Sequence, residues 1–252
     1  MNIFILLLLG AVQGLCEFLP ISSSGHLVLL SKIFHVEDSL FISIVLHVAT
    51  LLAVVIVFWK DIKYLILHPF SNKMIQLCLA TIFTAIIILV LLPLVKMSFS
   101  GEYLFICFLA SAIILFSVDI FSKNKKTKEF SLKTAIIMGI AQGFAVFPGI
   151  SRSGTTISAG LISGYDKKEC AKFSFILSIP IIILSMVEEI FEIIGAKQTL
   201  NVNFIGLFLA FIFAFVIGIL TIKLMIKVTE KTQFKWFGFY LLFLSSICII
   251  FL

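Results

Sequence analysis

Long apolar runs without a charged residue are the feature that most limits what this chain can fold into. A helix needs about 20 mainly apolar residues to cross the hydrocarbon core of a bilayer. Apolar residues make up 61% of the chain and charged residues 13%, against about 45–50% and about 25% in soluble domains. The sequence therefore predicts an all-α polytopic membrane protein, a single membrane domain over 1–252 with six transmembrane helices. The six runs are Phe41–Trp59, Leu77–Val95, Tyr103–Val118, Phe173–Val187, Phe204–Ile222 and Trp236–Leu252.

The first apolar stretch and the cysteines point to no cleaved signal peptide and no disulfide or metal site. The first apolar stretch, Ile3–Cys16, lacks the basic leader and cleavage site of a secretory signal, so we assign it to the mature fold. The cysteines are scattered and lie mostly inside apolar runs, so neither a disulfide framework nor a cysteine metal site is indicated. They are Cys16, Cys78, Cys107, Cys170 and Cys248.

The net charge of +6 reports membrane topology. Of the 19 cationic residues, 15 lie in or beside four alternate loops. Cytoplasmic loops carry the lysine excess, so these loops are expected to be cytoplasmic and both chain termini outside. This placement excludes nucleic acid as the partner and favours membrane lipids. The four loops are Lys60–Lys73, Lys123–Lys133, Lys167–Lys172 and Lys227–Lys235.

An internal repeat shows which part of the chain is unusual. Gly10–Gly25 aligns without a gap on Gly139–Gly154, and eight of the sixteen positions are identical. The identical residues are mostly Gly, Gln, Phe and Ser, whereas chance similarity between apolar stretches would match Leu and Ile. The chain is therefore read as two halves, about 1–122 and 131–252, joined by a basic cytoplasmic loop.

Each copy of the repeat is too short and too broken to cross the membrane twice. An apolar segment of about a dozen residues is followed by Pro with Gly or Ser, and then by a second short segment, Leu27–Phe34 or Thr155–Ile162. Paired interruptions of this kind indicate inverted repeats whose broken helices meet near the midplane. We therefore expect two re-entrant helical hairpins, the first opening outward and the second inward, with their polar tips together.

The two tips carry complementary polar side chains. Irregular backbone at membrane depth must line protein or a watery cavity, and a charge there marks a functional site by default. The first tip has the acid and the imidazole, and the second has the guanidinium. The first tip contains Gln13, Glu17, Ser22, Ser23, Ser24 and His26; the second contains Gln142, Ser151, Arg152, Ser153, Thr155 and Thr156, with Gly149 and Gly154 as further substrate-binding candidates.

These residue types suit a phosphate ester or anhydride. Arg152 can bind phosphate oxygens in a bidentate manner, and successive N–H groups from Gly149 to Thr156 can cradle an anion. Gln13 and Glu17, four residues apart on one helical face, offer oxygen ligands to Mg²⁺ or Ca²⁺. His26 can act as general acid or base, with Ser23 or a water as nucleophile. Two alternatives stay open: packing of a broken helix, and a Glu17–Arg152 pair that only joins the hairpins.

At these residues the sequence resembles the undecaprenyl-pyrophosphate phosphatase family, which is known for bacitracin resistance. Gln13-Gly-Leu-Cys-Glu17 matches the first family motif, and it runs on into Phe-Leu-Pro-Ile-Ser-Ser-Ser-Gly-His, which ends at His26. The second motif, Pro-Gly-x-Ser-Arg-Ser-Gly-x-Thr, matches Pro148–Thr156. Many members have Glu where Gln13 stands. The resemblance covers essentially the whole chain in length, span count and motif spacing.

The resemblance implies dephosphorylation of the C55 isoprenoid pyrophosphate to the monophosphate, dependent on a divalent cation and feeding peptidoglycan synthesis. It implies a multi-pass protein of the bacterial inner membrane whose site faces outward, and it leaves a homodimer open. Glu17 and Gln13 become residues that handle metal or water. His26 and Ser23 become the catalytic pair, and the phosphate cradle is formed by Arg152, Ser151 and Thr156, with Ser22, Ser24, Ser153 and Thr155 beside it.

Two rivals give different expectations. The phosphatidic-acid phosphatases share short Ser-Gly-His and Ser-Arg stretches, but they need a histidine after the Ser-Arg pair, and none follows Arg152. A lipid-carrier transporter or flippase is the second rival, because inverted repeats are a transporter architecture. A transporter needs charge recognition, but not a nucleophile beside a general base. Glu17, Ser23 and His26 together therefore favour the enzyme.

Overall fold

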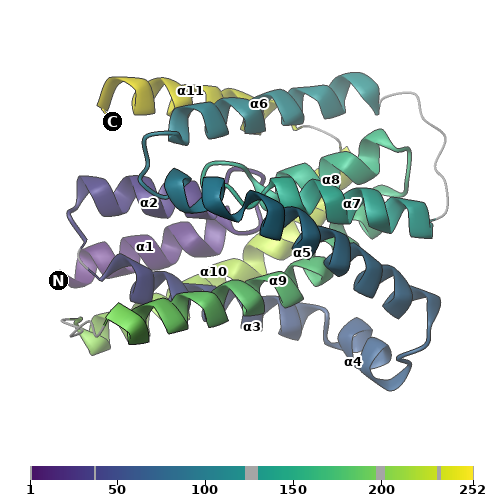
Figure 1. Ribbon diagram of the computed structural model, residues 1–252, viewed down its shortest axis with the longest axis horizontal. Coiled ribbons are helices and arrows are strands. Elements are labelled where there is room, and N and C mark those ends of the chain that lie inside the picture. Colours follow the sequence, from purple (N-terminus) through teal and green to yellow (C-terminus); the bar gives the residue numbers. More distant parts are fainter. Residues whose placement is uncertain (1, 37, 123–129, 197–201, 232–233, 252) are drawn as a thin grey trace.

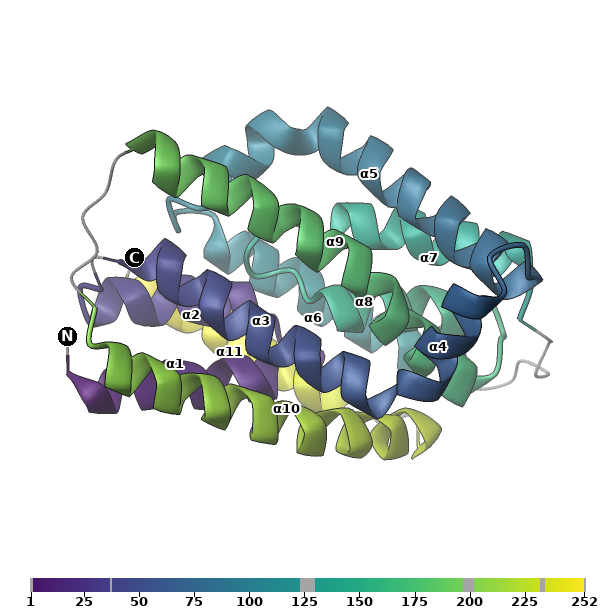
Figure 2. The same cartoon turned by 90° about the horizontal axis from the view of Figure 1, so that it is seen from below.

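The computed structural model describes residues 2–36, 38–122, 130–196, 202–231 and 234–251. Within these ranges the elements are α-helices, which confirms the all-α part of the predicted fold class, and Figures 1 and 2 show their arrangement. In chain order they are α1 (Ile3–Cys16), α2 (Ser23–Ile33), α3 (Ser39–Val57), α4 (Trp59–Leu67), α5 (Asn72–Ser98), α6 (Leu104–Phe121), α7 (Leu132–Phe144), α8 (Arg152–Ile162), α9 (Lys167–Ala196), α10 (Phe204–Lys231) and α11 (Lys235–Phe251).

Five of the described helices, α3, α5, α6, α9 and α10, are long and apolar enough to cross a membrane. Each of them overlaps one of the predicted runs. The sixth predicted span, Trp236–Leu252, falls on α11, whose 17 described residues are fewer than in the other five, and Leu252 lies outside the described residues. Side chains such as Val90 and Phe208, which are 73% and 64% exposed, face outward, as lipid-facing residues do. The chain is therefore a multi-pass membrane protein.

The four short segments predicted from the repeat are helices that stop at the expected breaks. In hairpin one, which is α1 and α2, the first helix ends before Pro20, and Ser22 at φ 67° caps α2 through its side chain. In hairpin two, which is α7 and α8, Gly149 takes φ 98° and Ser151 caps α8. A left-handed backbone is rare outside glycine, so Ser22 is held there by its surroundings.

Both hairpins pack against a long helix through a glycine at the same place in the repeat. A Cβ on Gly10 would lie 2.4 Å from the Ala210 carbonyl oxygen on α10, and one on Gly139 would lie 2.3 Å from that of Ala80 on α5. Small residues let membrane helices approach this closely. The first helices of the two hairpins, α1 and α7, therefore pack against α10 and α5 through equivalent glycine contacts.

The hairpin tips touch each other through residues that the repeat also pairs. A Cβ on Gly25 of hairpin one would lie 2.8 Å from the Gly149 backbone in hairpin two. A Cβ on Gly154 of hairpin two would lie 3.0 Å from Pro20 of hairpin one. Since Gly25 aligns with Gly154 and Pro20 with Gly149, each tip makes the same contact with the other. This reciprocal contact brings the polar residues of both tips to the middle of the molecule.

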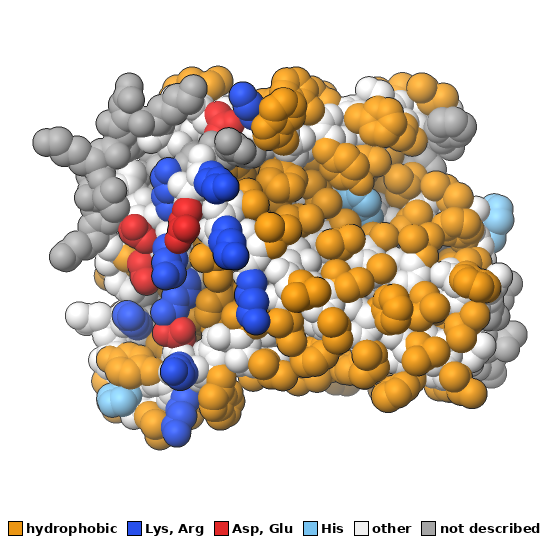
Figure 3. Space-filling view, turned by 180° about the vertical axis from the view of Figure 1, so that it is seen from behind, with side chains coloured by type: hydrophobic (Ala, Val, Ile, Leu, Met, Phe, Trp, Pro, Cys, Tyr) orange, Lys and Arg blue, Asp and Glu red, His pale blue; other side chains and the backbone are white. Residues whose placement is uncertain are grey.

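The molecule has two different ends. Both chain termini lie at one end, whereas α4 and the start of α7 lie at the other (Figure 1). Charged side chains gather at the α4 end, and most of the rest of that face is hydrophobic (Figure 3). An ion pair of 2.6 Å between Lys172 and Asp61 lies among them. The short helix α4, which no apolar run in the sequence predicted, carries Lys60 and Lys63 on one side and is apolar on the other.

Candidate active site

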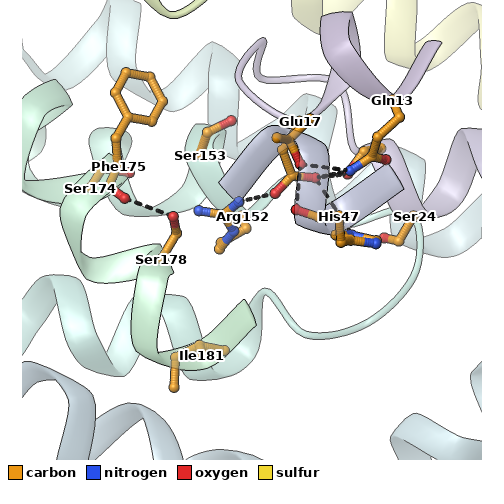
Figure 4. Close-up of polar contacts among 12 residues, drawn as sticks. Gln13, Glu17, Ser24, His47, Arg152, Ser153, Ser174, Phe175, Ser178 and Ile181 are labelled. Carbon is orange, nitrogen blue, oxygen red and sulfur yellow. Dashed lines mark hydrogen bonds and ion pairs between the residues drawn. The ribbon is translucent and has the colours of Figure 1, made fainter. Parts of the chain in front are cut away.

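Glu17 is the centre of the polar contacts between the tips. It follows the last turn of α1, and its side chain is only 3% exposed. Its Oε1 contacts Nη2 of Arg152, across the interface between the hairpins. Its Oε2 accepts hydrogen bonds from the Ser23 hydroxyl at 2.5 Å and the Gln13 amide at 3.0 Å. Figure 4 shows Glu17 between Gln13 and Arg152. Four residues predicted from sequence are therefore in one contact network.

Arg152 keeps part of its guanidinium unused. It is the first residue of α8, and its side chain is 15% exposed. While Nη2 contacts Glu17, Nη1 is buried and has no hydrogen-bond partner among the described residues. A buried donor without an acceptor costs about 1–3 kcal/mol. An anionic oxygen arriving beside Glu17 would satisfy it, so this side chain is suited to bind an oxyanion.

The predicted backbone cradle of hairpin two is largely used by the protein itself. The Gly149 N–H donates to Ser22 Oγ at 3.0 Å, and the Ser151 N–H donates to Ser111 Oγ at 2.8 Å. Ser22 and Ser151 in turn accept from the N–H groups of Gly25 and Gly154 and so cap α2 and α8. These residues hold the tips in place. The N-termini of both helices still point into the centre, where a helix N-terminus favours an anion.

The other predicted cradle residues surround this centre. Ser24 Oγ lies 3.4 Å from Ser22 Oγ, and Ser153 Oγ donates to the Leu19 carbonyl at 3.1 Å. Thr156 Oγ1 lies 2.5 Å from Ser174 Oγ on α9. Thr155 is buried in the first turn of α8. Ser153 and Thr156 thus join hairpin two to its neighbours.

His26 is buried but faces away from the Glu17 network in this conformation. Its Nδ1 lies 2.7 Å from the Ser22 carbonyl oxygen, and its Nε2 lies 2.7 Å from the Tyr240 hydroxyl. The resemblance makes His26 the partner of Ser23, whereas here the hydroxyl of Ser23 donates to Glu17. The residue closest to the general-base position for Ser23 is thus the carboxylate.

The sequence profile of the family described as "Bacitracin resistance protein BacA" matches residues 6–247. The chain belongs to this family. It is 40% identical to an undecaprenyl-diphosphatase of Treponema denticola, covering 96% of this chain and 94% of the relative. Proteins of the same name from Methanosphaera stadtmanae and Carboxydothermus hydrogenoformans are 36% and 37% identical, covering 99% and 95% of this chain and 98% and 94% of theirs. The resemblance drawn from the two motifs is thereby confirmed.

Within this member of the family, His47 on α3 is a site neighbour that the sequence reasoning missed. Its Nε2 lies 3.7 Å from Glu17 Oε2, and its Nδ1 lies 2.8 Å from the Ser43 carbonyl oxygen. Thr50, one turn further along α3, accepts from the Gln13 amide at 3.3 Å. A histidine inside an uncharged apolar run was the available signal, because polar groups at membrane depth are expensive.

The donor set fits a divalent cation that is held mostly by substrate. Gln13 Oε1 is buried and has no partner among the described residues, so one amide oxygen is available. Both oxygens of Glu17 already have partners, and no cluster of three or more His, Cys, Asp or Glu occurs in the described ranges. Mg²⁺ commonly binds through one or two carboxylates together with substrate phosphates. Gln13 and Glu17 would be the protein ligands of such an ion.

Proposed function

We propose that this protein hydrolyses undecaprenyl pyrophosphate, the C55 isoprenoid pyrophosphate, to the lipid monophosphate and inorganic phosphate. In this reaction the terminal phosphorus gains an oxygen from water, and the bridging P–O bond breaks. The support is membership of the family, relatives that carry the name undecaprenyl-diphosphatase, and a buried phosphate-type site in a membrane protein. Such turnover recycles the lipid carrier of peptidoglycan synthesis and supports resistance to bacitracin.

The observation that carries the proposal is the hydrogen bond of 2.5 Å from the Ser23 hydroxyl to Glu17, beside a guanidinium with a free donor. A nucleophile in hydrogen-bond reach of a base, with the base oriented by a third group, is the arrangement of nucleophilic catalysis. Glu17 takes the proton of Ser23, or of a water in its place. Arg152 binds the oxygens of the phosphate under attack, where charge develops. A transporter would have no use for the Ser23–Glu17 pair.

The remaining residues bind and orient in this proposal. The N-termini of α2 and α8 face the phosphate, and Ser24, Ser153 and Thr155 belong to the first turns of these helices. Gln13 holds Glu17 by its amide and offers its free oxygen to the cation. A bound Mg²⁺ or Ca²⁺ supplies charge stabilisation to the phosphate oxygens. His26 receives or returns a proton as the phosphate is released.

The proposal includes an inverted arrangement of the two halves in the bacterial inner membrane, with six spans, two re-entrant hairpins and a site open to the outside. Its support is that α1 and α7 begin at opposite ends of the molecule (Figure 1) and that the tips make reciprocal contacts. Lysine-rich loops are cytoplasmic by the positive-inside rule.

The loop around Lys126 lies outside the described residues, so Lys63→Cys and Glu102→Cys are the better probes of this topology. An impermeant thiol reagent on intact cells should label only Glu102→Cys, and labelling of Lys63→Cys would reverse the orientation.

The activity test is phosphate release by the purified full-length chain given undecaprenyl pyrophosphate, with and without a chelator. We expect one phosphate per lipid, loss of release with chelator, and a large loss in Ser23→Ala. Ser117→Ala removes a hydroxyl on α6 that donates to its own helix at Ile114, so it serves as the matched control and should stay active. A well-folded wild-type protein that binds the lipid but returns it unchanged would refute hydrolysis and favour a carrier.

A further inference from the structure

The hydrogen bonds of His26 define which nitrogen carries its proton. The Ser22 carbonyl oxygen can only accept, and it lies 2.7 Å from Nδ1, so Nδ1 is the protonated nitrogen. In the neutral ring Nε2 then carries a lone pair. The Tyr240 hydroxyl, 2.7 Å from Nε2, therefore donates its hydrogen to that lone pair. In this tautomer the Nε2 lone pair is engaged by the Tyr240 hydroxyl, so Tyr240 sets the direction of the ring.

The ring of His26 is also fixed in orientation. The His26 and Tyr240 rings lie within 6° of parallel with centroids 5.7 Å apart, which is too far for face-to-face stacking and fits an in-plane hydrogen bond. Phe108 of α6 meets the imidazole edge-on, with centroids 5.8 Å apart and planes at 72°. The ring is thus held by a carbonyl, a phenol and an aromatic wall, and His26 as a whole is 7% exposed.

Tyr240 lies far from the site in the sequence and at its edge in space. It belongs to α11, which packs on α6 through the Phe239–Phe116 contact and a hydrogen bond of 2.7 Å from Ser245 to the Phe105 carbonyl. Tyr240 itself is 39% exposed, beside Phe239 and Phe243 at 53% and 63% on the outer surface. Its phenol body lies toward lipid while its hydroxyl reaches inward to His26, as amphipathic aromatic residues can do.

We propose that Tyr240 is a positioning residue of the reaction: its hydroxyl holds the direction of the His26 imidazole, whose tautomer the Ser22 carbonyl sets, and its oxygen can turn to accept from Nε2–H once that nitrogen is protonated. This inference rests on the proposed function, in which His26 handles a proton. Tyr240 does not touch the phosphate in this proposal, and its effect passes through His26. If Tyr240 were only structural, its contact would serve to join α11 to hairpin one. The two roles predict different kcat values for Tyr240→Phe when His26 is also changed.

The test removes the hydroxyl alone, in Tyr240→Phe, with Tyr103→Phe as control because Tyr103 is a comparably exposed tyrosine at the start of α6. We expect Tyr240→Phe to lower kcat about 10-fold with KM nearly unchanged, the size of one lost hydrogen bond. Tyr103→Phe should behave as wild type. In a His26→Gln background the Tyr240→Phe change should cost nothing further, because the two act as a unit. Losses that multiply in the double variant would overturn the positioning role.

A nitrogen-15 spectrum of the histidine rings gives a readout that does not need turnover. The His26 signals are assigned by their absence from His26→Gln. In wild type we expect a protonated Nδ1 and a hydrogen-bonded Nε2, and in Tyr240→Phe the Nε2 signal should move downfield as its donor is lost. An unchanged Nε2 signal would overturn the inference, whatever the activity. If the wild type released no phosphate while the shift occurred, the proposed function would fail and the tyrosine contact would stand.

Discussion

The two hairpin tips share a backbone design but differ in what their side chains do. Each tip has a serine that caps its second helix, Ser22 or Ser151, and each has a glutamine in its first arm. Gln13 donates to Glu17, whereas Gln142 donates to Thr84 and the Leu177 carbonyl. The glutamine of tip two therefore serves packing, while that of tip one holds an acid.

The matching positions show how a duplicated scaffold can carry an asymmetric site. Glu17 aligns with Val146, and Ser23 aligns with Arg152, so tip one has the base and nucleophile and tip two has the cation. The reciprocal tip contacts bring Glu17 and Arg152 together although they are 135 positions apart. In this account tip one performs the chemistry and tip two binds the phosphate, and substitutions at matched positions test that division.

The largest effect is expected from Glu17→Gln, which keeps the shape of tip one and removes its base. General-base catalysis contributes about 10²–10⁴-fold, so single-turnover phosphate release should slow by about that factor. The matched control in tip two is Val146→Ala, which should stay near wild type. Folding of each variant is checked by size-exclusion chromatography. Full activity of Glu17→Gln with an unchanged cation requirement would leave Glu17 as a structural partner of Arg152.

Arg152→Lys tests tip two at constant charge. An ammonium cannot reproduce the planar fork that contacts Glu17 and presents Nη1, so we expect kcat/KM to fall about 10²-fold. Lys172→Arg, in the ion pair with Asp61 at the charged end, is a charge-conserving control that should be silent. Near-normal turnover in Arg152→Lys would reduce its role to charge pairing.

A smaller effect is expected from His47→Gln, which removes the imidazole near the base of tip one. Its Nε2 lies 3.7 Å from Glu17 Oε2, too long for a direct hydrogen bond, so its influence on the carboxylate is electrostatic or through water. We expect a loss of about 10-fold in kcat. The exposed His68 gives the control, His68→Gln. Equal rates in the two variants would show that His47 is only a neighbour of the site.

The smallest effect on turnover should come from Gln13→Glu. The same substitution at the equivalent repeat position, Gln142→Glu, should lower the stability of the protein. Gln13→Glu adds a carboxylate beside Glu17, where the proposed divalent cation would offset the added charge, and activity should stay within about 3-fold. Gln142→Glu buries a charge against the Leu177 carbonyl and should cost about 3–5 kcal/mol of stability. Thermal melting in detergent checks both. Equal melting temperatures would mean that the two glutamines have equivalent surroundings.

Much of this architecture could be predicted because short stretches of sequence determine where the helices run and where they break. Span length, Pro20 and Gly149, and the repeat itself predict the long helices, the broken ones and the meeting of the tips. The Glu17–Arg152 contact follows from that meeting, since each residue sits at a tip. The helix α4 was missed because its nine residues are neither long nor wholly apolar.

The partners of individual side chains could not be predicted in the same way. The family resemblance pairs Ser23 with His26. In the structure Ser23 donates to Glu17, and His26 is hydrogen-bonded to Tyr240, which is 214 positions away. The hydrogen-bond partner of a side chain depends on its rotamer, and that rotamer is set by packing against helices that are distant in the sequence. His47 was overlooked for the same reason: it lies in an apolar run, and only the packing of α3 beside hairpin one brings it near Glu17.

Binding of a non-hydrolysable substrate analogue tests the division between the tips most directly. A polyprenyl bisphosphonate, with a methylene in place of the bridging oxygen, is titrated into wild type, Glu17→Gln and Arg152→Gln in the presence of Mg²⁺. Removing a charged hydrogen-bond donor to phosphate costs about 1.5–3 kcal/mol, so Arg152→Gln should bind at least about 10-fold more weakly. At saturating Mg²⁺, Glu17→Gln should bind within about 3-fold of wild type although its turnover is lost, because the amide keeps an oxygen at the ligand position. Wild-type affinity in Arg152→Gln together with lost affinity in Glu17→Gln would contradict the account.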